Sequence, residues 1–311
     1  MTSTRAVLPA ARAVRADAAL AGAALLAGAA LLAPAAASAQ SCDRDCLGGI
    51  MTRFLEALVA NDPSLAPLAD GARFTEDTIE TPIGEGFWAT ASGLRDYRTD
   101  FLDVREQTAA VHALMEENGS PVLFAARLGV EDREIAEIET MVVRGRQEAM
   151  LFAPEALSEP SAAFATIPPA DALMPREAMI ELALRYPAGL RAGSFVAADV
   201  PFAPDAYRLE NGVRMAGPGC TFQPPGCVDM RNQQIPALPE ADGYVVAVDE
   251  ENGTVLLRLD FGRGSLMGGG RGGGEPQVLV TFEAFKIYGG QVHAVEAVFE
   301  SMPENAPTGW E

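Results

Sequence analysis

The sequence has little positive charge, with 23 Lys and Arg residues against 43 Asp and Glu residues over 311 positions, a formal net charge of −20. Nucleic-acid binders take their affinity from Lys and Arg side chains that neutralise phosphates, so this balance excludes a phosphate-backbone binder. It also disfavours docking to an anionic membrane surface. The hydrophobic fraction of 49% is too high for a disordered acidic chain. The length suits two compact domains of roughly 110–140 residues each.

Histidine is scarce as well, with His112 and His293 the two present. Structural zinc sites group cysteine pairs with histidines or further cysteines, so we expect no metal. No Gly-x-Ser-x-Gly elbow occurs, which disfavours covalent acyl transfer. Gly262–Gly274 lacks the GxxxxGK(S/T) pattern and opens no helix, so we expect a hairpin tip there rather than a phosphate-binding loop. Of the chemistries considered, acid/base catalysis without a cofactor is the one that the sequence still favours.

Long apolar runs are absent after the first 39 residues. There, three arginines precede an Ala- and Leu-rich run over residues 18–33, and Ala37-Ser38-Ala39 follows. This order predicts a secretory signal peptide over 1–39, cleaved after Ala39. The run is shorter than the ~20 residues that span a bilayer, which disfavours the alternative of a membrane anchor. We therefore expect a secreted or periplasmic protein with no membrane contact after cleavage.

The four cysteines fall into two local pairs. Cys42 and Cys46 stand at the start of a predicted helix, and Cys220 and Cys227 flank a Pro/Gly segment. An oxidising compartment allows disulfides, and four cysteines permit three connectivities. We favour the local pairing 42–46 and 220–227.

The rest of the chain repeats one order of elements. In the first half, a helix over 42–58 and a short helical turn over 64–70 precede predicted strands at 109–117, 122–130 and 135–143. In the second, a helix over 179–190 precedes strands at 243–249, 254–261, 278–287 and 292–300. Ile135–Val143 aligns with Val292–Glu300, and Glu76-Asp77 aligns with Glu210-Asn211. Chance similarity of two generic halves is the alternative.

Four short segments accompany this order of elements: Cys42-Asp-Arg-Asp-Cys46-Leu, Arg73-Phe-Thr-Glu-Asp77, Gly86-Phe-Trp88 and Arg208-Leu-Glu-Asn-Gly212. With them, the chain resembles the nuclear transport factor 2-like, or SnoaL-like, cone fold, in secreted bacterial and fungal proteins that carry two such units. It implies an α+β fold of two cone-shaped units, each with helices packed on a curved antiparallel sheet. The expected domains are 42–153 and 175–311, joined by a Pro/Ala/Ser-rich linker over 154–174. The superfamily includes lyases, hydrolases and binding domains, so fold alone does not give activity.

Two glutamates suit acid/base chemistry. Glu139 and Glu296 align with one another, each between apolar neighbours on its strand. Burial among apolar side chains raises the pKa of a carboxyl group towards the range of a general acid or base. The alternative is that each glutamate pairs with an arginine at a sheet edge.

An arginine near acidic residues recurs in both halves, and an arginine beside a carboxylate can also hold a substrate oxyanion. The residues are Arg73, Glu76 and Asp77 in the first half and Arg208, Glu210 and Asn211 in the second. Because Asn211 cannot titrate, one copy is expected to catalyse and the other to bind or scaffold. Asn211-Gly212 as a plain turn, and Glu210 as a structural partner of Arg208, are the alternatives.

Aromatic and histidine side chains complete the candidates. Trp88, with Phe87 beside it, is a candidate wall for a ligand, although core packing is the alternative. His112 and His293 lie on predicted strands, where packed or surface roles compete with that of a base. Tyr207 is a candidate phenol donor.

We place catalysis in the second half, because its longer loops can cover a pocket and exclude water. The candidate catalytic residues there are Glu210, Glu296, Arg208, Asn211, Tyr207 and His293. The candidate binding residues are Trp88, Arg73, Glu76 and Asp77. The expected activity is that of a lyase or hydrolase acting on a small organic molecule, for example an aromatic ether or lignin-derived fragment. A secreted binding protein without turnover is the alternative, and a monomer with an internal pseudo-dimer, or a homodimer, is the expected assembly.

The N-terminus gives the first prediction. The exported chain should begin at Gln40, because cleavage after Ala39 removes the signal peptide, and all four cysteines should resist alkylation without a reductant. Intact-mass measurement before and after alkylation checks both statements. An exported chain that retains residues 1–39, or that takes up four alkyl groups, would contradict them.

Overall fold

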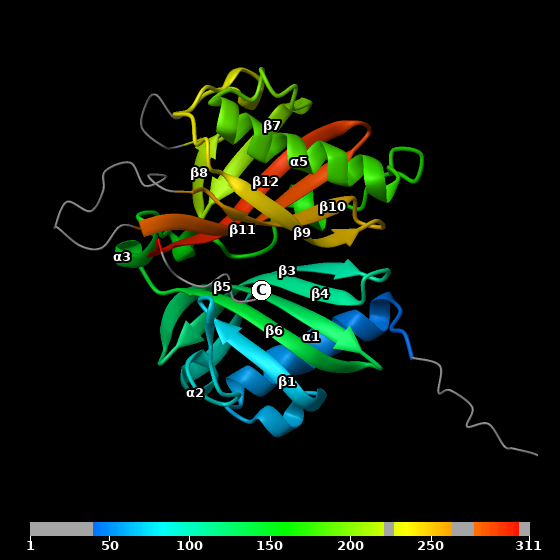
Figure 1. Cartoon of the computed structure of the whole chain (residues 1–311), viewed down its shortest axis with the longest axis vertical. Helices are drawn as coiled ribbons and strands as arrows, with labels where there is room; N and C mark the ends of the chain where they lie inside the picture. Colours follow the sequence, from blue (N-terminus) through cyan, green and yellow to red (C-terminus); the bar gives the residue numbers. More distant parts are fainter. Residues whose placement is uncertain (1–39, 221–226, 263–276, 305–311) are drawn as a thin grey trace, which may run out of the picture. The chain divides into compact units, whose positions relative to one another are not determined.

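The computed structural model describes residues 40–220, 227–262 and 277–304. Within these residues the chain forms two six-stranded sheets, each covered by one long helix (Figure 1). The predicted signal peptide and nearly all of Gly262–Gly274 lie outside the described residues. We call residues 40–143 the N-terminal half and residues 176–304 the C-terminal half.

The N-terminal half has the strand order β2-β1-β6-β5-β4-β3. Neighbouring strands are antiparallel except β1 and β6, which are parallel. Its elements are α1 (Arg44–Val59), η1 (Pro63–Leu65), β1 (Leu68–Glu76), β2 (Ile79–Glu80), α2 (Phe87–Thr90), β3 (Ala91–Asp103), β4 (Thr108–Glu117), β5 (Ser120–Glu131) and β6 (Glu134–Val143).

The C-terminal half has the equivalent order, β8-β7-β12-β11-β10-β9, again with one parallel pair, β7 and β12. Its elements are α5 (Arg176–Ala192), β7 (Phe202–Glu210), β8 (Val213–Ala216), η3 (Met230–Asn232), β9 (Asp242–Asp249), β10 (Thr254–Asp260), β11 (Gln277–Tyr288) and β12 (Gln291–Pro303). Three short helices join the halves: α3 (Arg146–Ala149), η2 (Pro154–Ala156) and α4 (Ala162–Ala165).

Strand register confirms the predicted alignment of the halves. Glu76 lies opposite Thr140, and Glu210 lies opposite Ala297, and these two partners are themselves aligned positions of the two halves. The backbone amides that follow, of Asp77 and Asn211, donate to those two carbonyls at 2.9 and 3.0 Å. The α+β class, with helices packed on a largely antiparallel sheet in each of two units, is therefore shown by the topology.

Five of the described strands, β1, β2, β3, β7 and β8, were not expected from the sequence. The predicted helical turn over 64–70 is wrong after its first residues, because β1 begins at Leu68. β3 and β7 were not expected as strands at all. β3 is an edge strand with several exposed positions and two irregular pairings with β4, so it has no clean alternation of apolar residues.

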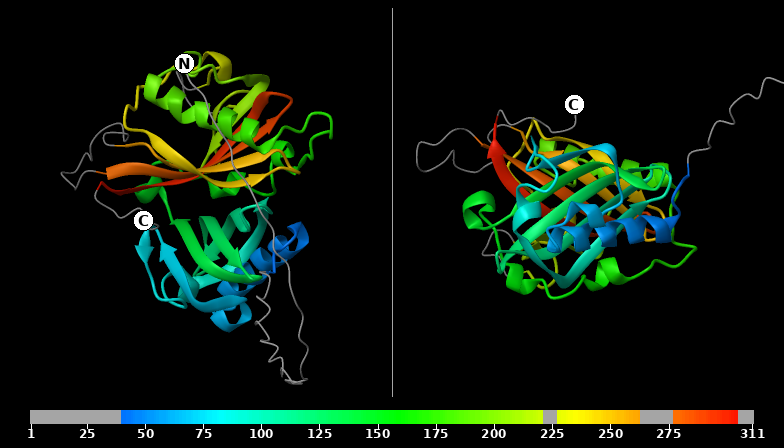
Figure 2. Two further views of the ribbon diagram at one scale, coloured as in Figure 1. Left: turned by 45° about the vertical axis from the view of Figure 1, so that its right-hand side comes forward. Right: turned by 90° about the horizontal axis from the view of Figure 1, so that it is seen from below.

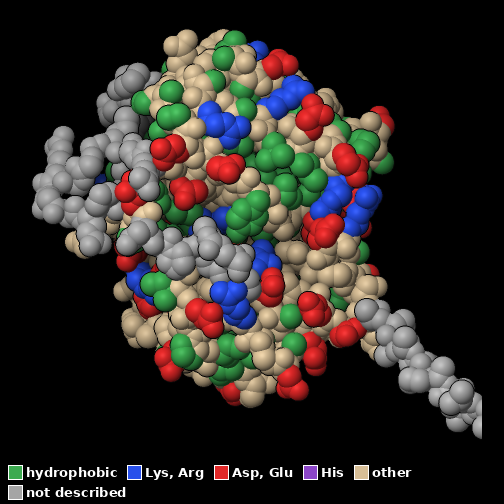
Figure 3. All heavy atoms as spheres, viewed as in Figure 1, with side chains coloured by type: hydrophobic (Ala, Val, Ile, Leu, Met, Phe, Trp, Pro, Cys, Tyr) green, Lys and Arg blue, Asp and Glu red, His purple; other side chains and the backbone are tan. Residues whose placement is uncertain are grey.

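Local sequence explains α1. Asp43 caps its N-terminus by accepting a hydrogen bond from the Cys46 amide at 2.9 Å. Leu47, Ile50, Phe54 and Leu58 recur at helical spacing and are buried in the core of the N-terminal half. The charged side chains of Arg53 and Glu56 in α1 are exposed. Acidic and basic groups are interspersed over the molecular face shown in Figure 3.

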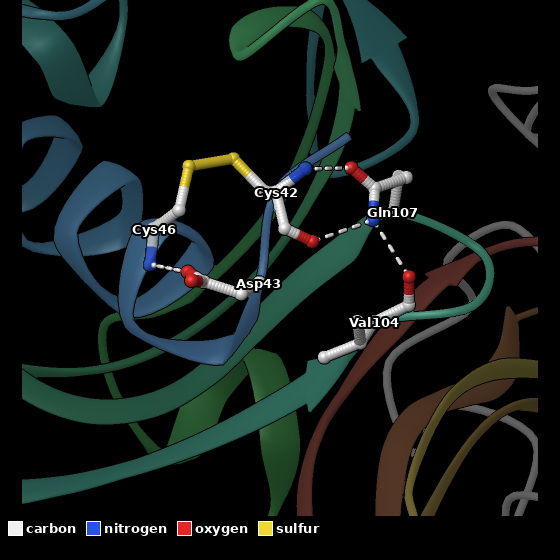
Figure 4. Close-up of a disulfide and its surroundings, with 5 residues drawn as sticks. All are labelled: Cys42, Asp43, Cys46, Val104 and Gln107. Atoms are coloured by element: carbon white, nitrogen blue, oxygen red, sulfur yellow. Dashed lines mark hydrogen bonds between the residues drawn. A yellow bond between two sulfur atoms is a disulfide. The ribbon is translucent and has the colours of Figure 1, made fainter. Parts of the chain in front are cut away.

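Both predicted disulfides are present. Cys42 and Cys46 are joined, with Cα atoms 5.2 Å apart, and Cys220 is joined to Cys227. Figure 4 shows the first of these beside Gln107, whose side chain accepts from the Cys42 amide at 2.5 Å and donates to the Cys42 carbonyl at 2.9 Å. The start of α1 is thereby tied to the turn between β3 and β4.

Each sheet buries its second face against the other sheet (Figure 2). This shared core contains Leu123, Ala125, Met141 and Val143 from the N-terminal half. Leu256, Phe282, Ala284 and Val298 contribute from the C-terminal half. The helix-covered faces form two separate cores. Apolar burial on both faces leaves each sheet dependent on its partner.

A buried ion pair also joins the halves. Asp103, at the end of β3, accepts two hydrogen bonds from Arg176 of α5 at 2.8 and 2.7 Å. Its Oδ2 also accepts from the Val248 amide of β9 at 2.8 Å. A carboxylate with this many donors satisfies its lone pairs, which offsets the cost of burial.

The segment expected as a linker, 154–174, is packed in place. Phe164 of α4 is buried and contacts the Phe101 ring edge-on at 6.1 Å. The Thr166 carbonyl accepts a hydrogen bond from the buried Lys286 ammonium at 2.6 Å. The domain boundaries proposed from the sequence stay predictions.

Removal of the Asp103 carboxylate should destabilise the fold strongly. Asp103→Ala leaves the Arg176 guanidinium buried without its partner, and we expect a loss of about 3–5 kcal/mol in the free energy of unfolding. Glu106→Ala is the control, because Glu106 is exposed and 3.9 Å from Arg176, so its loss should be within about 0.5 kcal/mol. Urea unfolding followed by fluorescence measures both. Equal effects of the two substitutions would contradict this role for Asp103.

Candidate active site

The two aligned glutamates lie in the core between the sheets. The Glu296 carboxylate accepts from Tyr207 at 2.6 Å and from Tyr97 of the N-terminal half at 3.4 Å. Burial raises the pKa of Glu296, and these hydrogen bonds oppose that shift. Glu139 lies 3.3 Å from Arg127 and 3.2 Å from Arg258 of β10, so it makes an ion pair across the two halves. Pairing with arginine, the alternative reading of the sequence, therefore describes Glu139.

Arg208 and Glu210 lie on the opposite face of the second sheet from Glu296, which corrects the expected grouping. Their side chains form an ion pair at 2.6 Å, and Arg208 also donates to Gln233 at 3.0 Å. Adjacent residues on a strand point to opposite faces, so Tyr207 joins Glu296 while Arg208 faces α5. In the register of the repeat, Arg208 corresponds to Phe74 rather than to Arg73.

Sequence reasoning missed Glu283, which is buried beside this ion pair. Burial raises the pKa of Glu283 to about 8, and the nearby Glu210 charge adds to the shift. Among the described residues its Oε2 atom has no hydrogen-bond partner. The surrounding helix-covered core is filled by Tyr186, Phe195 and Phe285, and none of the four pockets described for this structure opens onto Glu283.

The remaining first-half candidates divide between two places. Arg73 pairs with Glu80 at the surface, 3.2 Å away. The Glu76 carboxylate accepts from the Phe87 amide at 2.6 Å and from Arg144 at 2.7 Å. Arg144 also contacts Asp77 at 3.3 Å and Glu117 at 2.7 Å. One arginine therefore holds three carboxylates at the end of β6.

The turn after β1 differs chemically from its counterpart after β7. Asn211 has φ 46° and Gly212 has φ 83°, the pair that a two-residue hairpin with both central φ angles positive favours. Asp77 and Thr78 adopt the same turn, with φ values of 49° and 70°. A β-branched residue in this region is strained by about 1–3 kcal/mol, and such strain clusters at functional sites.

The side chains of Asp77 and Asn211 also occupy equivalent places. Asp77 accepts from the Val142 amide at 2.9 Å, and Asn211 accepts from the Phe299 amide at 3.0 Å. The Asn211 amide group donates to the carbonyls of Leu151 and Phe299 at 3.1 and 2.8 Å. Asn211 is thus a satisfied structural residue, as its reading as a turn implies, whereas Asp77 cannot donate while it is ionised.

Asp77 meets a second carboxyl group, that of Glu300 at the end of β12. The two carboxyl groups are hydrogen-bonded to one another. Burial raises the pKa of both, and for Glu300 the Asp77 charge raises it further. Two adjacent carboxyl groups cannot both ionise at low cost. The larger rise in the pKa of Glu300 and the contact of Arg144 with Asp77 favour a proton that is held by Glu300 and shared with Asp77.

A pocket of about 460 Å³ lies next to this dyad and is lined by its chain neighbours, not by Asp77 or Glu300 themselves. Thr78, which follows Asp77, lines it, and so do Val280, the cross-strand neighbour of Glu300, and Met302. Leu259 and Val278 add apolar surface, and Tyr244 and Arg258 add an aromatic ring and a guanidinium group. The volume is within the range of small-molecule sites.

Three buried polar atoms at this place lack hydrogen-bond partners among the described residues: Thr78 Oγ1, Arg258 Nη1 and Glu300 Oε1. Each such atom costs about 1–3 kcal/mol when it is left unsatisfied. A ligand with hydrogen-bonding groups would remove part of that cost. The dyad and the pocket together form the candidate active site.

The other predicted residues take part in packing. Trp88 is fully buried in the N-terminal core between Phe54 and Phe74, rather than at a ligand wall. His112 is buried against Phe101, and burial lowers its pKa to about 3, so it is neutral. His293 stacks on Tyr288 with ring centroids 3.6 Å apart. None of the three reaches the dyad.

Glu300 and Arg258 could have been found from the sequence in part. Glu300 closes the strand that aligns with Ile135–Val143, where Val143 is its counterpart, so a carboxyl group replaces an apolar residue there. Arg258 lies between Leu257 and Leu259 on β10, and an arginine within an otherwise apolar strand is a signal that the sequence itself contains. In the part of the chain that the structure describes, no group of three His, Cys, Asp or Glu side chains could hold a metal ion.

Comparison with known proteins gives a match to a family model over part of the chain and a similarity to a solved structure. A family described as a domain of unknown function (DUF8021) matches residues 172–299, which cover most of the C-terminal half and the four residues before it. Among solved structures, an NTF2-like protein of unknown function from Cytophaga hutchinsonii is similar at 11% identity and a TM-score of 0.27, over 35% of this chain and 94% of that chain. No curated protein matches. The fold class rests on the strand order and register described above.

The described helices include none with both the length and the apolar character to cross a membrane.

The raised pKa of Glu300 predicts a pH dependence of stability. The folded protein binds the Glu300 proton more tightly than the unfolded chain does. The stability that protonated Glu300 contributes is therefore complete below its ordinary pKa of 4.5, and it is lost as the pH rises through the raised pKa of the folded state. Glu300→Gln removes the proton equilibrium. As the pH rises from acidic to neutral, we expect the free energy of unfolding of the Glu300→Gln variant to fall less than that of the wild type.

Urea titrations at several pH values measure this difference. Glu131→Gln, at an exposed end of β5, is the control and should follow the wild-type pH profile. Parallel profiles for Glu300→Gln and the wild type would show that Glu300 titrates normally.

Proposed function

We propose that the protein is a cofactor-independent lyase or hydrolase that acts by acid/base chemistry on a small organic molecule, for example an aromatic ether. The observation that carries the proposal is the hydrogen-bonded carboxyl pair of Asp77 and Glu300 beside a pocket with unsatisfied polar atoms. This moves the chemistry from the second half alone, as the sequence predicted, to a place where both halves contribute.

The dyad suits a paired transfer of protons. The Asp77 carboxylate takes a proton from the substrate carbon, or from a water molecule, while the Glu300 carboxyl group gives its proton to the departing oxygen. In an elimination, the C–H and C–O bonds break, and a carbon–carbon double bond and an alcohol form. Asp77 is then protonated and Glu300 ionised, and one proton transfer along their hydrogen bond restores the starting state.

Other groups support developing charge. Arg258 and Thr78 line the pocket and carry unsatisfied donors, which suit an oxygen atom that gains negative charge in the transition state. Arg144 contacts Asp77 at 3.3 Å and favours its ionised form. Arg144 is a positioning residue, because it acts through Asp77.

A secreted binding protein without turnover is the second proposal. The observation that favours it is the burial of Glu300, which is 5% exposed, behind the wall of the pocket. In that case the same ligands bind but no bond breaks. Export is itself a proposal, supported by the two local disulfides and tested by the mass of the exported chain.

Substitution of either dyad residue should lower the turnover rate by at least about a hundredfold. Glu300→Gln removes the acid and Asp77→Asn removes the base, and loss of one such group lowers a rate by about 10²–10⁴-fold. A panel of aromatic ethers and esters, followed by mass spectrometry, supplies the substrate for the comparison. Glu283→Gln is the matched control, since it removes another buried carboxyl group outside the pocket, and we expect it to keep activity.

Loss of activity in Glu283→Gln with full activity in both dyad variants would place the chemistry beneath α5 instead. Ligand binding without turnover across the panel would favour the binding protein.

A further inference from the structure

The mouth of the pocket is strongly acidic. Asp242 and Asp260 lie directly opposite one another in the register of β9 and β10, and both line the pocket. Like charges directly opposite on neighbouring strands are unfavourable for a sheet, so this arrangement does not serve strand pairing.

The inner end of the pocket carries two hydrogen-bond donors, the Arg258 guanidinium group, whose charge Glu139 balances, and the neutral Thr78 hydroxyl group. Arg258 has a side chain 7% exposed, and its Nε lies 3.2 Å from the Glu139 carboxylate. Its Nη1 has no partner among the described residues, and the same holds for the Thr78 hydroxyl group. An acceptor oxygen would satisfy these donors, while a full negative charge would add to an environment that already contains Glu139 and Asp77.

Between the two ends the lining is apolar. Leu259, Val278, Val280 and Met302 contribute side chains, with the Tyr244 ring beside them. A ligand that fills this space needs an apolar body, because burial of apolar surface is the main source of affinity in such pockets.

We infer that the pocket selects uncharged molecules with an apolar body and an acceptor oxygen at one end, and that its acidic mouth excludes anions. This inference rests on the proposed function for the choice of pocket, but it concerns binding and not turnover. The facing carboxylates of Asp242 and Asp260 lower the local concentration of anions, and the two donors at the inner end select the oxygen.

Three probes of matched shape test the inference: 4-phenylbutanamide, 4-phenylbutanoate and 4-phenylbutylamine. Calorimetry on the full chain at neutral pH should show binding of the amide, with the carboxylate at least about tenfold weaker. Added salt should reduce the difference in affinity between the amide and the carboxylate, because it screens exposed charges. The double substitution Asp242→Asn/Asp260→Asn should narrow the gap in the same way.

Two further variants test the inner end. Arg258→Met should weaken amide binding by about tenfold or more, since it removes the principal donor. Because Arg258 also pairs with Glu139, Thr78→Val tests the donor end without disturbing that ion pair, and it should weaken the amide as well. Circular dichroism confirms that each variant is folded before its affinity is compared.

The outcomes separate clearly. Binding of the carboxylate as tight as that of the amide, a gap that the double substitution leaves unchanged, or no binding of any probe at millimolar concentration would overturn the inference. Tightest binding of the amine would overturn the uncharged class in favour of cations. Glu300→Gln distinguishes the two proposals: if it keeps full turnover on the panel while amide selectivity holds, the proposed function fails and the ligand class stands.

Discussion

Burial of the second face of each sheet against the other is the constraint on which the rest of the structure depends. A helix covers the first face of each sheet, and the shared core with Phe282 and Met141 covers the second. Ionisable side chains on the second faces therefore enter a common interior and need partners from the opposite half. Glu139 forms an ion pair with Arg258, Glu296 accepts a hydrogen bond from Tyr97, and Glu300 shares a hydrogen bond with Asp77. The candidate site is a product of this packing, because neither half contains it alone.

The repeat explains why the dyad is built once. Asp77 and Asn211 occupy the same turn, and Val143 and Glu300 occupy the same strand position. The reciprocal combination, Asn211 with Val143, has no titratable group. Asn211 also satisfies two carbonyls that an aspartate could not, because an ionised carboxylate accepts hydrogen bonds and does not donate them. Divergence of two equivalent positions in opposite directions converts a symmetric scaffold into one with a single acid/base pair.

The sequence predicted elements with strong local periodicity and missed those defined by pairing. α1, α5 and the strands β4 to β6 and β9 to β12 follow apolar spacing, and the alignment of Glu139 with Glu296 holds in the register. β3 and β7 lack that pattern, and their strand character comes from hydrogen bonds to neighbours. The predicted grouping of site residues was wrong for a related reason. Period-two alternation separates the two faces of a strand, but it does not indicate which face packs against the other half. Tyr207 and Arg208 were grouped together although they face opposite sides.

The chain itself shows that the fold does not require a carboxyl group at Glu300, since the equivalent position in the N-terminal half is Val143, a buried residue of the shared core. Replacement of a buried polar pair by apolar residues is often neutral or stabilising, so Glu300 and Asp77 add a cost that packing does not repay. Thr78 adds strain at a turn where the other half has Gly212. Unfavourable burial, an unsatisfied donor and a strained backbone therefore coincide at one pocket, and proteins depart from locally favourable choices chiefly where a site has a function to perform.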